Sequence, residues 1–243
     1  MPWACKAEGM CGRVILSQSQ SEISSFLKAT LFPERLIEPD YNLTPSKDLY
    51  IAVDKGGDDS AVVRSLEIAR WGLVPSWAKD PSIGNKLTNA RSETVHEKPS
   101  FSAAYARRRC LVPVNGYYEW YVSSQLNAAG KPKKQPFCME HPDGDILTIA
   151  GLYEWWRPTR TDPWQLTCTL LTRAAAPNLE QIHDRMPVIV PPDRWAWWLD
   201  NSRQVDVNEL PPAFVEPHPV STAVNSSKSE GPSLREPIDF DFD

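Results

Sequence analysis

Cys11, in the segment Met10-Cys11-Gly12-Arg13, is the residue with the most distinctive potential chemistry in this sequence. A cysteine at a chain's N-terminus carries two nucleophiles on adjacent carbons, an α-amine and a thiol. This pair can condense with an aldehyde and close a five-membered thiazolidine ring, whereas an internal cysteine has its nitrogen tied up as an amide. Nine residues precede Met10. The chemistry therefore depends on cleavage before Cys11, or on translation from Met10 followed by removal of the methionine.

Two other residues could transfer protons. His183 stands beside an acid and a base in His183-Asp184-Arg185, which suits proton transfer near an anion. A surface loop histidine is the alternative. Glu119 lies among aromatic residues in a strand-like run, where an inward orientation would raise its pKa through loss of hydration. An outward orientation would make it an ordinary surface charge. Strand alternation places Trp120 on the face opposite Glu119, so the sequence leaves the choice open.

Two further segments could contact a nucleic acid. Asn89, Arg91 and Glu93 alternate along the chain, so an extended backbone would present them on one face, as a phosphate or sugar site requires. A polar loop is the alternative. Trp71 and Trp77 flank a proline-containing turn and could stack on bases if exposed. The chain has ten tryptophans, however, so most of them belong to the core.

Composition restricts the class of protein. The 243 residues are 41% hydrophobic and 23% charged, which is typical of a soluble globular chain of one large domain or two small ones. No apolar run approaches the roughly 20 residues of a membrane span, and the first ten residues lack a secretory signal. Five scattered cysteines without a C-x-x-C pair argue against a disulfide framework or a zinc knuckle. We therefore expect a cytoplasmic protein with no metal or cofactor and no membrane contact.

The charge distribution is uneven. The net charge is −5, but the tail from Glu236 to Asp243 contributes −4 of it, which leaves about −1 for the rest. Basic residues cluster at Arg107-Arg108-Arg109 and at Lys131, Lys133 and Lys134. Local charge matters more than net charge for binding phosphate. These clusters could bind phosphate or form solvated loops.

The remaining patterns predict a β-rich α+β fold in a single domain. Ser19 and Glu22 form a capping box before apolar residues at helical spacing up to Leu31. A second helix is expected near Pro192, and the last dozen residues are expected to be mobile. The predicted strands are Leu49–Val53, Val62–Trp71, Cys110–Val114, Tyr117–Val122, Phe137–Glu140, Ile146–Leu152 and Trp164–Leu171.

Taken together, seven segments resemble the SRAP family, the SOS-response-associated peptidase proteins, in order and approximate spacing. The resemblance runs from Met10 to about residue 238. The segments are Met10-Cys-Gly-Arg13, Tyr41-Asn-Leu-Thr-Pro45, Trp71-Gly-Leu-Val-Pro-Ser-Trp77, Asn89-Ala-Arg-Ser-Glu93, Gly116-Tyr-Tyr-Glu-Trp120, His183-Asp-Arg-Met-Pro187 and His218-Pro-Val-Ser221.

The resemblance implies a protein that recognises abasic sites in single-stranded DNA and shields them with a covalent crosslink. It also implies a barrel-like antiparallel core with flanking helices. Cys11 matches the crosslinking cysteine, Asn89 the residue that positions it, Glu119 the acid/base carboxylate and His183 the proton-transfer histidine. Matches to DNA-binding positions are Arg13, Pro45, Trp71, Leu73, Arg91, Trp120, Thr172 and Arg185.

The resulting organisation is a leader at residues 1–9, an SRAP-type domain at 10–230 and an acidic tail at 231–243. The leader departs from the family pattern, in which the cysteine follows the initiator. We expect a monomer with lyase-like Schiff-base chemistry, associated with the nucleoid in a bacterium or located in the nucleus of a eukaryote. Two alternatives remain: a thiol peptidase that cleaves its own chain between Met10 and Cys11, and a non-covalent reader of modified DNA.

Overall fold

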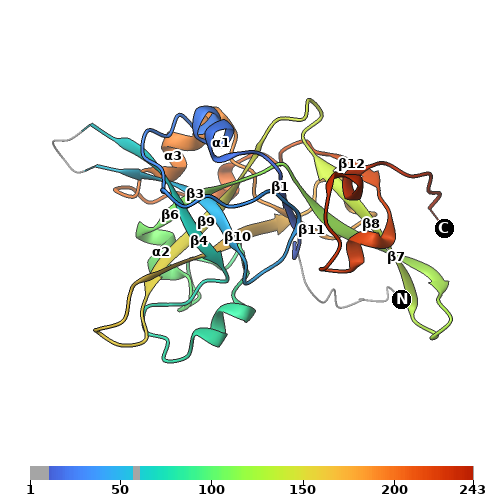
Figure 1. Ribbon diagram of the computed structural model, residues 1–243, viewed down its shortest axis with the longest axis horizontal. Coiled ribbons are helices and arrows are strands. Elements are labelled where there is room, and N and C mark those ends of the chain that lie inside the picture. Colours follow the sequence, from blue (N-terminus) through green and yellow to red (C-terminus); the bar gives the residue numbers. More distant parts are fainter. Residues whose placement is uncertain (1–10, 57–60, 243) are drawn as a thin grey trace.

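The computed structural model describes residues 11–56 and 61–242 (Figure 1). The predicted leader, residues 1–9, lies outside the described residues. The fold is 37% strand and 17% helix and forms a single domain with two sheets, which confirms the predicted β-rich α+β class. Among the described residues, no helix is long and apolar enough to cross a membrane.

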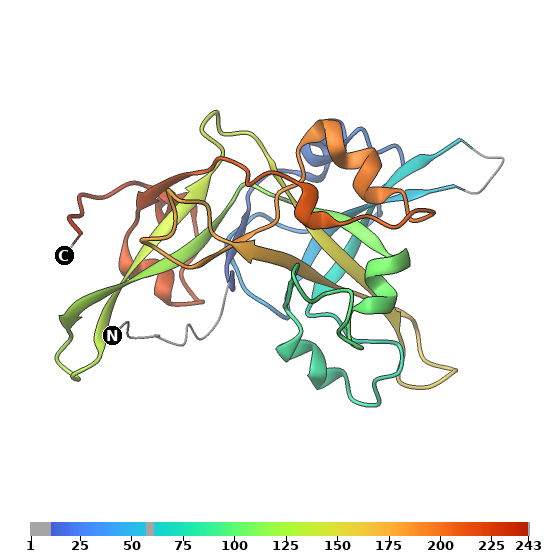
Figure 2. The same ribbon diagram turned by 180° about the vertical axis from the view of Figure 1, so that it is seen from behind.

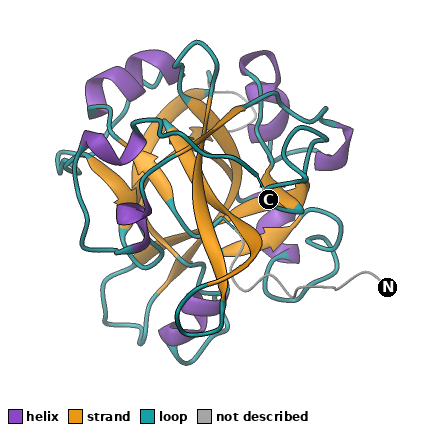
Figure 3. Ribbon diagram, turned by 90° about the vertical axis from the view of Figure 1, so that its right-hand side faces the viewer, coloured by secondary structure: helices purple, strands orange, loops and turns teal. Residues whose placement is uncertain are grey.

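The larger sheet closes on itself. Its strands are hydrogen-bonded in the order β10-β4-β3-β6-β9, and β9 pairs again with β10 to complete a barrel. These pairings are antiparallel except the one between β10 and β4. Figure 3 shows the strands at the centre with helices and loops around them. The barrel strands are β3 (Asp48–Lys55), β4 (Val63–Trp71), β6 (Arg109–Val114), β9 (Leu147–Trp156) and β10 (Gln165–Ala174).

Two short strands extend the barrel beside β10. One is β5 (Asn89–Arg91), which pairs parallel with β10, and the other is β11 (Arg185–Pro187), which pairs antiparallel with it. Both carry segments that were predicted to contribute site residues. The register places Arg91 opposite Thr172 and Met186 opposite Arg173, so β10 holds both segments in place.

The second sheet is antiparallel throughout, in the order β12-β8-β7-β1-β2. Its long β7–β8 hairpin projects at the end of the molecule opposite the β3–β4 hairpin (Figures 1 and 2). Asn115 is the single residue between β6 of the barrel and β7 of this sheet. The strands are β1 (Val14–Leu16), β2 (Asp40–Leu43), β7 (Gly116–Leu126), β8 (Pro132–Glu140) and β12 (Glu216–Pro219).

The first helix begins where the sequence predicts it. Helix α1 (Gln20–Leu27) follows Ser19, and both halves of the Ser19–Glu22 capping box are formed. It ends earlier than its apolar pattern, because Lys28 adopts a left-handed conformation with φ of 56°. Leu31 therefore lies beyond the helix and is exposed.

The remaining helical segments are short. Helix α2 (Ser102–Arg107) precedes β6. Helix α3 (Trp195–Leu199) confirms the helix expected near Pro192 and buries Trp195 and Trp198. The 3-10 helices are η1 (Pro81–Lys86), η2 (Pro192–Arg194), η3 (Val207–Glu209), η4 (Thr222–Asn225) and η5 (Pro232–Arg235).

The C-terminal segment is packed, so the expectation of a mobile tail is wrong for its described part. Leu234 is buried in a small core with Tyr118 and Val220. The backbone N–H of Ile238 donates to the carbonyl of Pro219 at 2.9 Å. Further along, Phe240 packs against the main core. Apolar residues between the acidic ones therefore hold the tail on the second sheet.

Candidate functional site

Strand β7 determines the orientation of Glu119. Tyr117 and Tyr121 join the main core, whereas Tyr118 joins the small core on the opposite face. Alternation places Glu119 on the face of Tyr117, and its side chain is 2% exposed. Burial raises the pKa of Glu119 to about 8, with a further contribution from Asp184. The inward orientation that the sequence left open is thus the observed one.

Cys11 lies directly over this carboxyl group. Val14 pairs with Tyr117, so the residues before β1 run alongside Glu119. The backbone nitrogen of Cys11 donates a hydrogen bond to Glu119 Oε1 at 2.6 Å. The cysteine adopts a left-handed conformation with φ of 36° and is buried. Burial, with a smaller contribution from Glu119, raises the pKa of its thiol. The thiol is therefore neutral at physiological pH.

His183 approaches the other oxygen of the same carboxyl group. Its Nε2 lies 3.8 Å from Glu119 Oε2. The backbone N–H of Arg185 donates to Nδ1 at 3.0 Å, which assigns the hydrogen of the neutral ring to Nε2. Burial lowers the pKa of His183, partly opposed by the nearby Asp184 carboxylate. A neutral imidazole thus faces a carboxyl group of raised pKa.

Asn89 reaches the site from the barrel. Its Nδ2 donates to the carbonyl oxygen of Cys11 at 3.4 Å. Strand β5 holds it there through the parallel pairing of Asn89 with Leu170. The structure therefore brings together the four residues predicted as catalytic, at the junction of the two sheets. Glu119 comes from the second sheet and Cys11 from the turn before its strand β1, and Asn89 and His183 come from segments beside the barrel.

Arg13 and Trp120 lie on the opposite face of β7 from Glu119. Arg13 Nη1 donates to Asn42 Oδ1 at 2.6 Å and to the carbonyl of Val224 at 2.7 Å. The Arg13 guanidinium also lies 5.7 Å from the centre of the Trp120 ring, a cation–π contact. Buried Asn42 additionally donates to the carbonyl of Ser226. These contacts fix the orientation of Arg13 and attach the C-terminal segment to β2.

Arg91 and Arg185 differ in their availability. Arg91 is exposed on β5. Arg185 forms a two-pronged ion pair with Glu93, at 2.5 and 2.9 Å, and also donates to the carbonyl of Thr172. The same pair lowers the pKa of Glu93. A phosphate would have to displace Glu93 to reach Arg185. Pro45, in the turn between β2 and β3, is partly exposed.

Three residues predicted to contact DNA do not reach the surface. Trp71, Leu73 and Thr172 are completely buried. Trp71 donates from its indole N–H to the carbonyl of Thr88, and a Cβ on the neighbouring Gly72 would lie 2.7 Å from the carbonyl oxygen of Gly84. The structure does not support base stacking on Trp71 or Leu73, or a direct DNA contact by Thr172. Trp71 and Leu73 instead belong to the main core.

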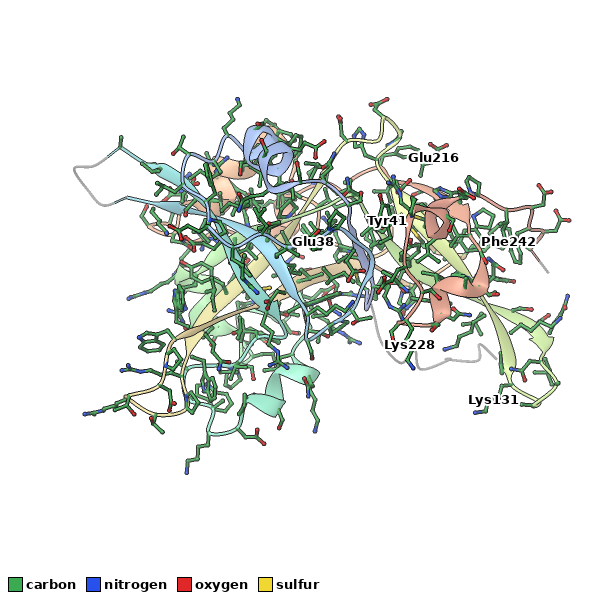
Figure 4. All side chains as sticks on the ribbon, viewed as in Figure 1. Glu38, Tyr41, Lys131, Glu216, Lys228 and Phe242 are labelled. Atoms are coloured by element: carbon green, nitrogen blue, oxygen red, sulfur yellow. The ribbon has the colours of Figure 1, made fainter. Side chains whose placement is uncertain are left out.

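The basic cluster Arg107-Arg108-Arg109 has a structural role in part. The sequence suggested phosphate binding or a solvated loop for it, and neither describes Arg109. Arg109 is buried, and its guanidinium donates to the carbonyls of Trp198, Tyr105, Asp200 and Arg203. It thereby satisfies carbonyls at the end of α3. The second cluster is solvated, because Lys131, Lys133 and Lys134 are exposed on the β7–β8 hairpin (Lys131 in Figure 4).

Sequence reasoning missed Tyr117. This tyrosine is fully buried, and its hydroxyl has no hydrogen-bond partner among the described residues. Burial raises its pKa, with Cys11 and Glu119 as the next contributors, so the hydroxyl is a neutral donor close to the site. Its spacing of two residues from Glu119 on a strand was the available signal. Glu93 was seen as part of a polar array, but not as the partner of Arg185.

One group of side chains has the composition of a metal site. Among the described residues, Cys138, Glu140 and His218 bring their ligand atoms within 4.8 Å of one another. Arg235 donates to Glu140 at 2.6 Å, and His218 Nε2 lies 2.9 Å from the carbonyl oxygen of Arg235. The guanidinium thus already supplies a positive charge. These contacts indicate that the group attaches the C-terminal segment to the second sheet through Arg235, rather than binding a cation.

Comparison with known proteins identifies the class to which this fold and this site belong. Residues 10–227 match the family described as SOS response associated peptidase (SRAP). The chain is 36% identical to the abasic site processing protein YoqW of Bacillus subtilis, over 93% of this chain and 99% of that protein. This chain therefore belongs to the SRAP family.

More distant relatives share the same region. The abasic site processing protein HMCES of Gallus gallus is 33% identical, over 83% of this chain and 67% of its own length. A crystal structure of a protein from Bacteroides thetaiotaomicron superimposes with a TM-score of 0.78 at 21% identity, covering 94% of this chain and all of that one. That likeness supports the fold.

Proposed function

We propose that this protein recognises abasic sites in single-stranded DNA and forms a thiazolidine crosslink through Cys11 once its amine is free. The observation that carries the proposal is the 2.6 Å contact between the Cys11 nitrogen and Glu119 Oε1. It places an acid/base group of matched pKa against the nitrogen that would attack the sugar. The relatives named as abasic site processing proteins supply the class of substrate.

The chemistry begins with the sugar. An abasic site is mostly a closed hemiacetal, and His183 moves a proton at the ring oxygen so that the aldehyde opens. The Cys11 amine adds to C1′ to give a carbinolamine. Glu119 protonates the hydroxyl of this intermediate, water leaves and a Schiff base forms. An α-amine has a pKa of about 7.7–8.0 against about 10.4 for lysine, so far more of it is free base at neutral pH.

The thiol completes the crosslink. Cys11 Sγ adds to the C=N carbon, a C–S bond forms and the thiol proton passes to the nitrogen. One water is the only product released. Thiol and amine belong to the same residue, so ring closure benefits from a high effective concentration. Asn89, which contacts the Cys11 carbonyl, holds the residue in position for both steps.

Positive groups around the site would bind the DNA backbone. Arg91 is exposed, whereas Arg13 and Arg185 are held by partners within the protein, and Arg185 would bind a phosphate only by releasing Glu93. Half-exposed Trp120 and Pro45 offer surfaces for flanking bases. We propose that the protein acts as a monomer, with the nucleoid in a bacterial cytoplasm or in a eukaryotic nucleus.

A second activity would supply the free amine. The contact from the Cys11 nitrogen to Glu119 also favours cleavage of the Met10–Cys11 bond by the protein itself. The bond would take up one water, and the departing nitrogen of Cys11 would receive a proton from Glu119. This autopeptidase step and the crosslinking reaction would use the same acid/base group in succession.

Abasic single-stranded DNA tests the proposal. Protein whose intact mass shows a free Cys11 amine should form an adduct that survives a denaturing gel. Cys11→Ala should abolish the stable adduct, because no thiol remains to close the ring. Cys11→Ser should give a Schiff base that borohydride traps, without the stable product.

Four outcomes separate the alternatives. A stable adduct from Cys11→Ala contradicts the thiazolidine scheme, and reversible binding alone identifies a non-covalent reader. Release of residues 1–10 by the purified full chain, lost in Glu119→Gln, supports the autopeptidase. An unprocessed chain that crosslinks as well as the processed one would also contradict the need for a free amine.

A further inference from the structure

The face of β7 that carries Glu119 continues beyond the site as an aromatic surface. Phe137 pairs with Glu119, and Tyr121 pairs with Gln135 one step further along the hairpin. Paired residues of antiparallel strands point to the same side. We call Tyr121 and Phe137 the aromatic face. By the same alternation, Lys133 lies on this side of β8, beyond Tyr121.

The C-terminal tail covers this surface. Here the tail means residues 236–242, the part of the acidic C-terminal segment that lies over the aromatic face. It is anchored by the Ile238–Pro219 hydrogen bond. Phe242 stacks on Phe137, with ring centres 5.4 Å apart and planes 14° apart, and meets Tyr121 edge-on at 5.0 Å. Phe240 contacts both rings of the aromatic face edge-on. Figure 4 shows Phe242 beside the β7–β8 hairpin, with Lys131 at the far end of that hairpin.

The tail has the chemical pattern of a single strand of nucleic acid. In Asp239-Phe240-Asp241-Phe242 a negative charge alternates with an aromatic ring. Single-stranded DNA alternates phosphates with bases, and proteins bind it by stacking the bases on aromatic side chains beside basic residues. The aromatic face offers the rings, and Lys133 is an exposed positive charge on the same side.

We propose that the aromatic face is a contact surface for single-stranded DNA, continuous with the Cys11 site, and that the tail occupies it as an internal competitor. The proposal rests on the proposed function for the nature of the ligand. DNA entering the site would displace Phe240 and Phe242 and stack in their place. The tail would thus reduce affinity for undamaged single strands.

A purely structural tail makes a different prediction. If Phe240 and Phe242 only cover apolar surface, their removal lowers stability and leaves DNA affinity unchanged or lower. The acidic residues distinguish the two roles further. Asp239 and Asp241 are not needed to cover apolar rings, but they repel phosphates and compete for the lysines of the hairpin.

The test measures binding of a fluorescent, undamaged single-stranded oligonucleotide, which requires no crosslinking chemistry. The full chain is compared with a chain ending at Pro237, with Phe240→Ala/Phe242→Ala and with Asp239→Asn/Asp241→Asn. We expect the first two changes to tighten binding about tenfold, the value of one stacking contact, and the third to tighten it less. Ile238→Ala is the matched control, since it alters the tail but neither ring nor charge. Circular dichroism establishes that each variant is folded.

A second set of variants tests the surface itself. In the shortened chain, Lys133→Gln should weaken binding, whereas Lys55→Gln, at the end of β3 in the barrel, should not. Equal or weaker binding by both folded tail variants overturns the proposal. Failure of every form to crosslink abasic DNA would instead overturn the proposed function, while tighter binding by the shortened chain would still support the surface.

Discussion

At the scale of single residues, burial separates the acid/base behaviour of two neighbours. Loss of hydration raises the pKa of Glu119 to about 8 and lowers the pKa of His183. Each shift favours the neutral form, and the two groups lie 3.8 Å apart. Glu119 therefore holds its proton at neutral pH but can still release it there, and His183 remains a neutral ring beside it. This is the behaviour that reversible formation and loss of a Schiff base requires.

The raised pKa of Glu119 has a consequence for stability. The folded protein keeps this proton up to a pH of about 8, whereas the unfolded chain loses it near pH 4.3. Between these values the folded state binds more protons, so stability falls as pH rises, by at most about 1.4 kcal/mol per unit. Gln cannot titrate, so the free energy of unfolding of Glu119→Gln, relative to that of the wild type, should increase with pH across this range. Urea unfolding at several pH values measures the difference, and parallel curves would contradict the assigned pKa.

The hydroxyl of Tyr117 gives a second prediction at this scale. Because this hydroxyl is buried without a partner among the described residues, Tyr117→Phe should raise the free energy of unfolding by about 1 kcal/mol. The adjacent Tyr118 is the matched control, since its hydroxyl donates to the carbonyl of Tyr41 at 3.1 Å. Tyr118→Phe should lower stability by about the same amount. Two changes of the same sign in chemical denaturation would contradict this account.

At the scale of elements, local sequence patterns were sufficient to predict most of the strands of the barrel. The Ser19–Glu22 box marks the start of α1 because capping is decided within four residues of sequence. The seven predicted strands all lie in β3, β4 and β6 to β10, with ends displaced by a few residues. Alternation and β-propensity are properties of a single segment, so they can be read without the fold.

The elements that build the site could not be predicted in this way. Strands β5 and β11 have three residues each, too few for a periodic signal. The contact between Cys11 and Glu119 joins residues 108 positions apart. The burial of Arg109 and Trp71 was also not predicted, because a run of arginines suggests a surface position and the resemblance implied a contact with DNA for Trp71. Inside the protein, a carbonyl near the end of α3 accepts from the Arg109 guanidinium, and the carbonyl of Thr88 accepts from the indole N–H of Trp71.

At the scale of the whole molecule, the site depends on how two sheets are joined. Glu119 belongs to the second sheet and Cys11 lies just before its strand β1, while Asn89 and His183 are attached to the barrel. Asn115 connects β6 to β7 where the sheets meet, and its Oδ1 accepts from the N–H of Ser17 at 2.8 Å. Its own N–H donates to the carbonyl of Ile15. This residue therefore fixes β1, and Cys11 before it, relative to the barrel.

Asn115→Ala should therefore affect both stability and chemistry. Loss of the Ser17 partner should lower the free energy of unfolding by about 1–2 kcal/mol. Crosslinking to abasic DNA should also slow, because small displacements of reacting groups reduce rates strongly. Asn201→Ala is the matched control: Asn201 Oδ1 likewise accepts one backbone N–H, from Arg109, but does not join the sheets. It should lose comparable stability while its crosslinking rate stays that of wild type. If both variants crosslink at the same rate under conditions where both are folded, the relative position of the sheets is not fixed by Asn115.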